Sequence, residues 1–275
     1  MATITVDTLS DDPGAGLTLR VAIAQASRTV EADTIRFAAG LNGAVHLGSA
    51  GQLSVTGGGP LTVDGDGRIT IDANADGDAD ARSSAFADGI GTGFSARRAI
   101  DIAGGLAVTL DGLTITGGLT TASADGGGGV RAGGGAQLTL VDTTVRGNGT
   151  TGGNADGGGV RGEYGASVTL LSSTVSGNGT SGNLADGGGV SANGALSVTS
   201  STVSGNVITG SSALGGGLQG AFGVTLVSST VSGNGAEGLS GAAGGVYARG
   251  GFTLTDSIVL GNHATNAGRA EAFAV

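Results

Sequence analysis

Acidic and basic side chains recur at matching positions in the second half of the chain. Asp125, Asp156 and Asp186 each stand directly before a run of glycines, and Arg131 and Arg161 follow the first two of these runs. A rank of carboxylates can bind a cation against an acidic substrate, and a basic group beside it can take part in proton transfer. The alternative is structural, because aspartates also bond turn amides and pair with neighbouring arginines, while glycines let adjacent backbones pass closely.

A second acidic segment, residues 72–80, carries oxygen-bearing side chains at alternate positions and a glycine at the sixth. Its spacing, D-x-N-x-D-G-x-x-D, is that of the first nine positions of an EF-hand-type loop, in which hard carboxylate oxygens suit Ca²⁺. The twelfth position is Ser83, so the bidentate carboxylate of such a loop is missing. The pattern predicts Ca²⁺ as a cofactor, with a solvated acidic loop as the alternative. The predicted ligands are Asp72, Asn74, Asp76, Asp78 and Asp80.

The sequence supports no other catalytic constellation. The chain has no Cys, which excludes disulfides, thiolate catalysis and Cys-ligated zinc. Its two histidines, His46 and His263, lie far apart and lack metal-ligand spacing, so neither a zinc site nor a Ser-His-Asp triad is indicated. The aspartate and arginine rank is the candidate catalytic site that remains.

The charge balance bears on possible partners. The chain has 22 acidic and 12 basic residues, every basic one an arginine, and a formal net charge of −10. Because the arginines are scattered, we expect no nucleic-acid partner and no attraction to an anionic membrane surface. No apolar run approaches the roughly 18 residues of a transmembrane helix, so we expect no membrane insertion.

A repeat indicates the fold class. The segment LTLVDTTVRGN, which ends at Asn148, recurs in similar form along the rest of the chain, and the closing asparagines are 30, 28, 28 and 28 residues apart. Repeats of this length indicate a solenoid, a propeller or an array. Each unit carries three short alternating β segments and no stretch long enough for a crossover helix. We therefore expect an all-β fold, a right-handed parallel β-helix with three strands per coil of about 28–30 residues.

Alternation within each unit predicts which side chains face the core. Leu138 and Leu140 flank Thr139, and a period of two places the leucines inside and the threonine outside. The recurring Gly-Asn pair fits a tight turn whose asparagine bonds the backbone or the asparagine one coil away. An interior stack of β-branched residues is expected at Val145, Val175, Val203, Val231 and Val259.

The N-terminal third is less regular. Residues 17–27 have the pattern of an amphipathic helix, and such a helix covers the open end of a solenoid. We expect a single domain over residues 1–275. Its parts are an N-terminal strand and capping helix (1–37), irregular coils with an acidic loop near 72–95 (38–116), regular coils (117–262) and a C-terminal tail (263–275).

The segment after the helix, ADTIRFAAGLNGAVHLGSAGQLSVTGGGPLTVDGDGRITIDA, resembles the N-terminal region of secreted bacterial right-handed β-helix proteins. That group is similar to the pectin-lyase-like superfamily and to polymorphic outer-membrane-protein repeats, and the resemblance covers essentially the whole chain. It implies the fold and a secreted or cell-surface location. It does not imply one chemistry, because such proteins include adhesins, surface scaffolds, lyases and epimerases.

The resemblance to polysaccharide lyases implies stacked carboxylates that bind Ca²⁺ against a uronate, with an Arg or Lys nearby that abstracts a proton. The chain departs from that pattern because it has no Lys and because its aspartate rank stops after Asp186. An acidic enzyme acting on an acidic glycan would also need Ca²⁺ or the arginine pair to offset repulsion. The residues that would fill these roles are Asp125, Asp156, Asp186, Arg131 and Arg161.

Outward threonines and serines predict two hydroxyl ranks, which resemble those of ice-binding proteins. Arg146 interrupts the ranks, and Ile258 with Leu260 ends them, so ice binding is a remote alternative. The paired positions are Thr114 and Thr116, Thr174 and Ser176, Thr202 and Ser204, and Thr230 and Ser232.

The C-terminal residues leave the edge of the last coil without a predicted cover, and an uncovered edge is a template for self-association. The final segment, 271–275, is acidic and then apolar, which resembles the end of proteins exported in one step with an uncleaved C-terminal signal. We expect an exported or cell-surface scaffold, structural or adhesive, stabilised by Ca²⁺, with a polysaccharide or cell-surface glycan as partner. The alternative is a polysaccharide lyase or epimerase acting on acidic glycans.

Overall fold

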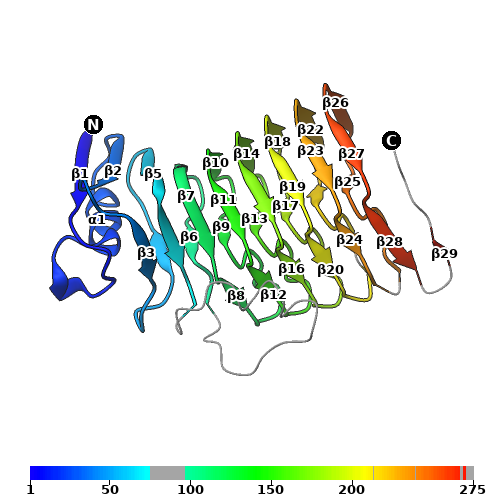
Figure 1. The fold of residues 1–275 in the computed structure, drawn as a ribbon, viewed down its shortest axis with the longest axis horizontal. Helices are drawn as coiled ribbons and strands as arrows, with labels where there is room; N and C mark the ends of the chain where they lie inside the picture. Colours follow the sequence, from blue (N-terminus) through cyan, green and yellow to red (C-terminus); the bar gives the residue numbers. More distant parts are fainter. Residues whose placement is uncertain (75–96, 213, 239, 267–268, 271–275) are drawn as a thin grey trace.

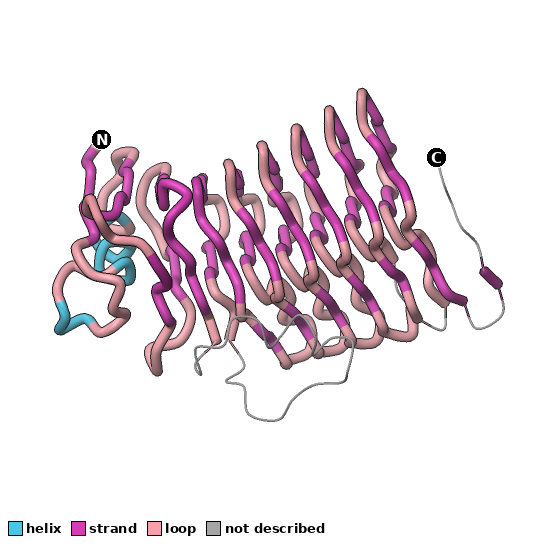
Figure 2. The backbone as a smooth tube through the Cα atoms, in the orientation of Figure 1, coloured by secondary structure: helices cyan, strands magenta, loops and turns pink. Residues whose placement is uncertain are grey.

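Short alternating segments form parallel strands, each paired with its equivalent one repeat away. The computed structural model describes residues 1–74, 97–212, 214–238, 240–266 and 269–270. These residues form a right-handed parallel β-solenoid of about 8 turns with about 46% strand, which confirms the expected fold class. The turns stack along the long axis, and the N-terminus lies at one end of the rod (Figures 1 and 2).

One regular turn contains four short strands. They are β9 (Val130–Ala132), β10 (Gln137–Val141), β11 (Thr144–Arg146) and β12 (Gly149–Thr150). Strands β10 and β11 belong to the same sheet, because both pair with the single long strand β7 (Ala107–Thr116). The expected three strands per coil therefore correspond to three sheets, and a bend divides the strand of one sheet into two.

The first sheet holds the divided strands and the N-terminal strands, 15 in all. Its other members are β1 (Ala2–Val6), β2 (Asp33–Phe37), β3 (Gly43–His46), β5 (Leu61–Asp72), β14 (Ser167–Leu171), β15 (Thr174–Ser176), β18 (Leu196–Thr199), β19 (Thr202–Ser204), β22 (Val224–Val227), β23 (Thr230–Ser232), β26 (Phe252–Thr255) and β27 (Ile258–Leu260).

The second and third sheets have seven strands each. Besides β9, the second sheet contains β4 (Leu53–Val55), β6 (Ile100–Ile102), β13 (Val160–Gly162), β17 (Val190–Ala192), β21 (Leu218–Gly220) and β25 (Val246–Ala248). Besides β12, the third sheet contains β8 (Leu119–Thr120), β16 (Gly179–Thr180), β20 (Val207–Ile208), β24 (Gly235–Ala236), β28 (His263–Asn266) and β29 (Arg269–Ala270).

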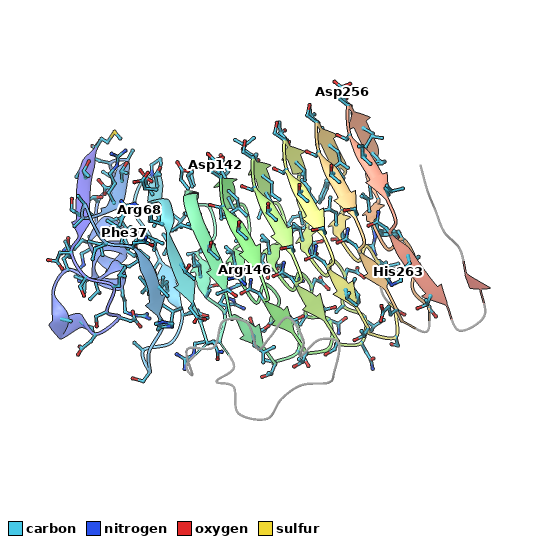
Figure 3. The ribbon with its side chains drawn as sticks, viewed as in Figure 1. Phe37, Arg68, Asp142, Arg146, Asp256 and His263 are labelled. Carbon is cyan, nitrogen blue, oxygen red and sulfur yellow. The ribbon has the colours of Figure 1, made fainter. Side chains whose placement is uncertain are left out.

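At the bend in the first sheet, the equivalent residue of each turn adopts the left-handed backbone conformation, and these residues form a row along the rod. A positive φ is rare outside glycine, although short polar side chains tolerate it. Asp142 and Asp256, labelled in Figure 3, lie along the same edge of the rod. The row consists of Gly112, Asp142, Ser172, Ser200, Ser228 and Asp256, with φ between 44° and 58°.

The residue after each bend forms a hydroxyl ladder, which we define as Thr143, Ser173, Ser201, Ser229 and Ser257. Each hydroxyl oxygen accepts the backbone N–H of its equivalent one turn earlier, as when the Ser173 N–H donates to Ser201 Oγ at 3.0 Å. Each also donates back to a backbone carbonyl two residues before it, and Ser201 Oγ reaches the Thr199 carbonyl at 2.7 Å. The ladder supplies partners to backbone groups that the bend removes from the strand ladder.

A second ladder, the asparagine ladder, consists of Asn148, Asn178, Asn206, Asn234 and Asn262. The side-chain oxygen of Asn206 accepts both the backbone N–H and the Nδ2–H of Asn178, each at 3.0 Å. Asn206 Nδ2 donates in turn to the Val175 carbonyl and to Asn234 Oδ1. The expectation that each asparagine bonds the backbone and the asparagine one coil away is confirmed.

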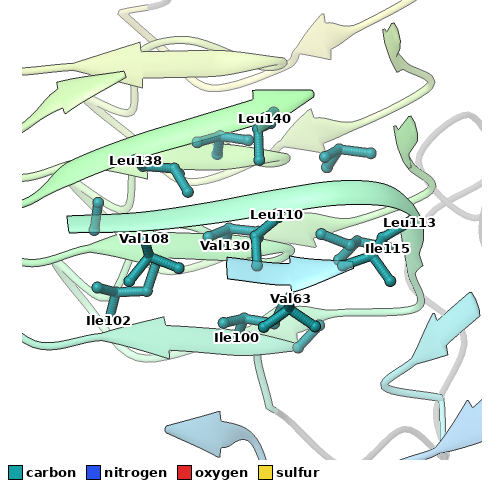
Figure 4. Packing of buried hydrophobic residues seen from close by; sticks show 14 of the residues in the cluster. Val63, Ile100, Ile102, Val108, Leu110, Leu113, Ile115, Val130, Leu138 and Leu140 are labelled. Atoms are coloured by element: carbon teal, nitrogen blue, oxygen red, sulfur yellow. The ribbon is translucent and has the colours of Figure 1, made fainter. Parts of the chain in front are cut away.

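Aliphatic side chains fill the space between the sheets (Figure 4). Leu138 and Leu140 are buried, and Thr139 between them is only partly buried, as the alternation predicts. The valine stack is fully buried at Val145, Val175, Val203 and Val231, and Val259 in the last turn is partly buried.

An α-helix covers the N-terminal end. Helix α1 (Leu19–Ala26) lies within the predicted segment 17–27, and the Thr18 hydroxyl caps it by accepting from the Val21 N–H. Leu19, Ala22, Ile23 and Ala26 are buried on its inner side. A 3₁₀ helix, η1 (Pro13–Ala15), precedes it. In the described part of the chain no helix is long and apolar enough to cross a bilayer.

The last turn is more exposed than those before it. Phe252 and Leu254 are 41% and 38% exposed, whereas Val224 and Leu226, their partners in the preceding turn, are 2% and 0% exposed. The chain then forms strand β28 at the start of the predicted tail, and β28 pairs antiparallel with β29.

Candidate functional site

The two predicted arginines lie side by side on the second sheet. Arg131 is the middle residue of β9, and Arg161 is its register partner on β13. Asp101 on β6 precedes them in the same row. The residues on either side of Arg131, Val130 and Ala132, are fully buried, so the alternation of the strand directs this row outward.

These side chains belong to a continuous series of ion pairs, which we call the ion-pair chain. Glu163 Oε1 accepts from Arg161 Nε at 3.0 Å and from Arg131 Nε at 3.2 Å. Arg131 Nη1 donates to Asp101 Oδ1 at 2.7 Å, and Arg98 Nη1 donates to the same oxygen at 3.0 Å. Close contacts between Arg98 and Asp125 and between Arg161 and Asp156 complete the chain at its two ends.

The ion-pair chain brings together most of the predicted site. Asp125, Arg131, Arg161 and Asp156 all belong to it, linked by residues that the sequence analysis did not assign to the site. Arg98 and Asp101 lie in the less regular part of the chain, but Asp101 stands 30 residues before Arg131. Extending the repeat one unit toward the N-terminus would have found it.

Asp186 follows Asp156 in the next turn, where Ser191 stands in the place of Arg161 and the charges of Arg249 and Arg161 act on the carboxylate. The Asp186 backbone N–H donates to Asp156 Oδ1 at 2.9 Å, and the Leu214 backbone N–H bonds the Asp186 carboxylate in the same way. Burial and the neighbouring Asp156 raise the pKa of Asp186 to about 6. Burial also raises the pKa of Asp156, although Arg161 opposes this shift.

The arginines remain charged. Burial disfavours the charge of Arg161, but Asp156 and Glu163 raise its pKa above the ordinary value. Burial likewise opposes the charge of Arg131, and Asp101 and Glu163 raise its pKa. Burial would raise the pKa of Glu163, but Arg161 and Arg131 lower it. A guanidinium held in this way donates hydrogen bonds and is a poor proton acceptor.

Asp125 and Arg98 also border a surface cavity of about 360 Å³, together with Gln52, Arg97 and Thr120. A second cavity of about 350 Å³ lies beside α1 and is lined by Arg20, Arg28 and Ser54, among others. Asp156, Arg161 and Asp186 line neither cavity.

The predicted calcium segment lies partly outside the described residues. Asp76, Asp78 and Asp80 fall within 75–96, whereas Asp72 and Asn74 are described and buried. Asp72 Oδ1 accepts the Asn74 backbone N–H at 2.9 Å, and Asp72 Oδ2 lies 3.1 Å from His46 Nδ1. Both oxygens of Asp72 thus have protein partners. Among the described residues no group of three or more His, Asp or Glu side chains is arranged to hold a metal ion.

The hydroxyl ranks have the register that the sequence predicts. Thr114, Thr144, Thr174, Thr202 and Thr230 align on successive strands, and Ile258 follows. In the second rank Arg146 stands between a threonine and a serine, and that threonine, Thr116, is fully buried. The first hydroxyl rank is therefore regular from Thr114 to Thr230, whereas the second is interrupted at Arg146.

The fold and the repeat place the chain in the class of parallel β-solenoid repeat proteins. No protein-family model matches the chain, and no curated protein matches it in sequence.

Proposed function

We propose that the chain is a rigid scaffold of an exported or cell-surface protein, adhesive rather than catalytic. The observation that supports this proposal best is the ion-pair chain. In it the candidate carboxylates Asp125 and Asp156 are paired with Arg98 and Arg161. The candidate bases Arg131 and Arg161 share Glu163, and Arg131 also binds Asp101. Groups used in this way hold neighbouring turns together, and a rod built by repetition presents its surface residues at fixed spacing.

The electrostatics of the arginines supports the same proposal. A lyase that uses Arg131 or Arg161 as its base needs a neutral guanidine at the reacting proton. The pKa of each is raised, so neither loses its proton readily. The exported location is part of the proposal and rests on the resemblance to secreted β-helix proteins.

A polysaccharide lyase or epimerase is the second candidate, and one observation favours it. Asp186 has a pKa of about 6, which suits a general base near neutral pH. It stands beside Asp156, whose pKa is also raised. Perturbed carboxyl pairs are frequent at active sites, but structural networks perturb pKa values as well.

The experiment that separates the two is turnover of a panel of polyuronates with Ca²⁺ present, followed by NMR of the products. The scaffold proposal expects no elimination and no epimerisation in the natural chain. Turnover that is lost in Asp186→Asn, while the variant unfolds as cooperatively as the natural chain, would establish the enzyme and overturn the scaffold. Glu31→Gln, an exposed carboxylate away from the ion-pair chain, is the matched control.

Calcium stabilisation and self-association complete the proposal. The acidic spacing of 72–80 supports Ca²⁺, and we expect the melting temperature to rise with Ca²⁺ and to rise less in Asp78→Asn. Four partly exposed apolar side chains in the last turn support association of that end, and sedimentation at rising concentration tests it. They are Phe252, Leu254, Ile258 and Leu260.

A further inference from the structure

Two exposed aromatic rings lie on the row of turns that connects the second sheet to the first. Tyr164 lies in the turn between β13 and β14, and Phe222 lies two turns further along, between β21 and β22. Tyr164 is 77% exposed and Phe222 is 61% exposed. Neighbouring turns of the row carry Gly134 and Gly250 at this place, so no side chain stands beside the two rings at the equivalent positions.

The rings contact each other. Their centroids are 6.1 Å apart and their planes meet at 69°, the edge-to-face arrangement that aromatic rings favour. Residues two turns apart are separated by about 9.6 Å along the rod, because neighbouring strands lie about 4.8 Å apart. The two side chains therefore lean toward each other across the turn at Asn193 and Gly194.

Backbone hydrogen bonds hold the turns that carry the rings. The Tyr164 carbonyl accepts the Gly135 N–H at 3.1 Å, and the Ala221 N–H donates to the Ala192 carbonyl at 2.9 Å. The rings consequently stand on a pre-organised surface, which lowers the entropy cost of binding. Because most of each ring faces solvent, core packing does not explain the presence of the two aromatic side chains.

Two charged groups lie on the turn that carries Tyr164 and on the turn before it. Glu163, the residue before Tyr164, binds Arg131 and Arg161 through Oε1. The Arg131 and Glu163 side chains remain 33% and 26% exposed. A rigid carboxylate accepts hydrogen bonds from hydroxyl groups, and the guanidinium donates to hydroxyl and ring oxygens.

We propose that Tyr164 and Phe222 form a stacking site for a neutral hexopyranose unit of a glycan. The C–H face of a sugar ring packs on the electron-rich face of an aromatic ring, and its hydroxyls meet Glu163 and Arg131. A neutral sugar fits better than a uronate because Glu163 and Arg131 already neutralise each other and the chain carries a net charge of −10. The inference rests on the proposed adhesive scaffold and gives its partner a chemical class.

Tyrosine fluorescence tests the proposal directly, because the chain has two tyrosines and no tryptophan. In a Tyr247→Phe background, Tyr164 reports alone. The probes are cello-, chito- and manno-oligosaccharides at millimolar concentration, with oligogalacturonate as the acidic comparison. We expect at least one neutral oligosaccharide to change the Tyr164 emission and to show saturation transfer from the protein in NMR.

Variants place the binding on the ring pair. We expect Phe222→Ala to weaken the neutral oligosaccharide about tenfold in the fluorescence titration. Tyr164→Ala removes the fluorescent reporter, so its binding is measured by saturation-transfer NMR, and we expect it to weaken the oligosaccharide by the same factor. Leu184→Ala removes an exposed apolar side chain from a different row of turns and should leave the affinity unchanged. Binding that survives in the double variant Tyr164→Ala/Phe222→Ala would overturn the proposal.

The remaining outcomes are also decisive. No response to any neutral oligosaccharide, or tighter binding of oligogalacturonate, overturns the stacking site and leaves the scaffold proposal standing if no polyuronate is turned over. If no sugar binds and Tyr164→Ala changes the sedimentation of the free chain, the ring pair is a contact between copies of the chain. That result would also overturn the proposal. Polyuronate turnover would overturn the scaffold independently of these results.

Discussion

The asparagine ladder and the ion-pair chain both connect successive turns of the same rod, but by different chemistry. In the asparagine ladder every member is the same residue, and the four before Asn262 are buried and make the same neutral bonds to the next turn. In the ion-pair chain the members differ from turn to turn and border solvent. The first depends on shape and hydrogen bonding alone, whereas the second depends on charge and therefore on pH.

Asn206→Ala tests the ladder and should have the largest effect. It removes the acceptor of the Asn178 N–H and a donor to the Val175 carbonyl, both buried. Leaving such groups unpaired should lower the free energy of unfolding by about 3 kcal/mol. Urea denaturation at pH 7 and at pH 4.5 should give the same loss. Asn183→Ala, an exposed asparagine, is the control, and a loss of under about 1 kcal/mol in Asn206→Ala would contradict the role of the ladder.

Arg161→Met tests the ion-pair chain and should cost about 2 kcal/mol at pH 7, because it leaves Asp156 partly buried without a cation. The cost should shrink toward pH 4.5, since burial raises the pKa of Asp156 and the lone carboxyl then takes up a proton. Denaturant midpoints over this pH range measure the effect. A cost independent of pH would show that Arg161 acts by packing rather than by charge.

Ser201→Ala and Thr202→Val compare the inner hydroxyl ladder with the outer hydroxyl rank at adjacent positions. Ser201 is 4% exposed and accepts the Ser173 N–H, so its loss should cost about 1.5 kcal/mol. Thr202 faces outward, and the β-branched valine should change stability by less than about 0.5 kcal/mol. Thermal unfolding of the two variants under the same conditions gives the comparison, and equal losses would contradict it.

Asp186→Asn should have a small effect of the opposite sign. A pKa raised from 3.8 to about 6 means that the folded chain binds this proton more tightly than the unfolded chain. Its stabilising effect is full below about pH 4 and is lost as the pH rises through about 6. The shift corresponds to about 3 kcal/mol at full strength, which solvent screening reduces to about 1 kcal/mol. The neutral amide should therefore stabilise the chain by about 1 kcal/mol at pH 7 and have no effect at pH 4. Destabilisation of Asp186→Asn at pH 7, with Glu31→Gln unchanged, would contradict the assignment.

The repeat made much of the fold predictable. The Val145 stack and the asparagine ladder follow from residue type and spacing, because a position that recurs every 28 to 30 residues must pair with its own equivalent. The bend at Asp142 was not predicted, since a positive φ at Asp or Ser leaves no period in hydropathy. For the same reason the hydroxyl ladder was not separated from the outer hydroxyl ranks one residue away.

The candidate site was predictable only in part. Asp156 and Arg161 recur with the glycine runs and so were found together. Their links through Glu163 depend on where long side chains reach across turns, which neither spacing nor alternation determines. Asp186 shows the same limit. Its place in the repeat matches that of Asp156, and yet its environment differs because its own turn carries Ser191 where the turn of Asp156 carries Arg161.

The asparagine ladder also makes the rod adjustable in length. Each asparagine offers the preceding turn the same acceptor that it takes from the following turn, so within the ladder one turn can replace another. Deletion of residues 179–206 would bring Asn178 against Asn234 with every amide partner replaced in kind. The length of the rod is therefore set by the number of turns, and each turn is one unit of a one-dimensional repeat.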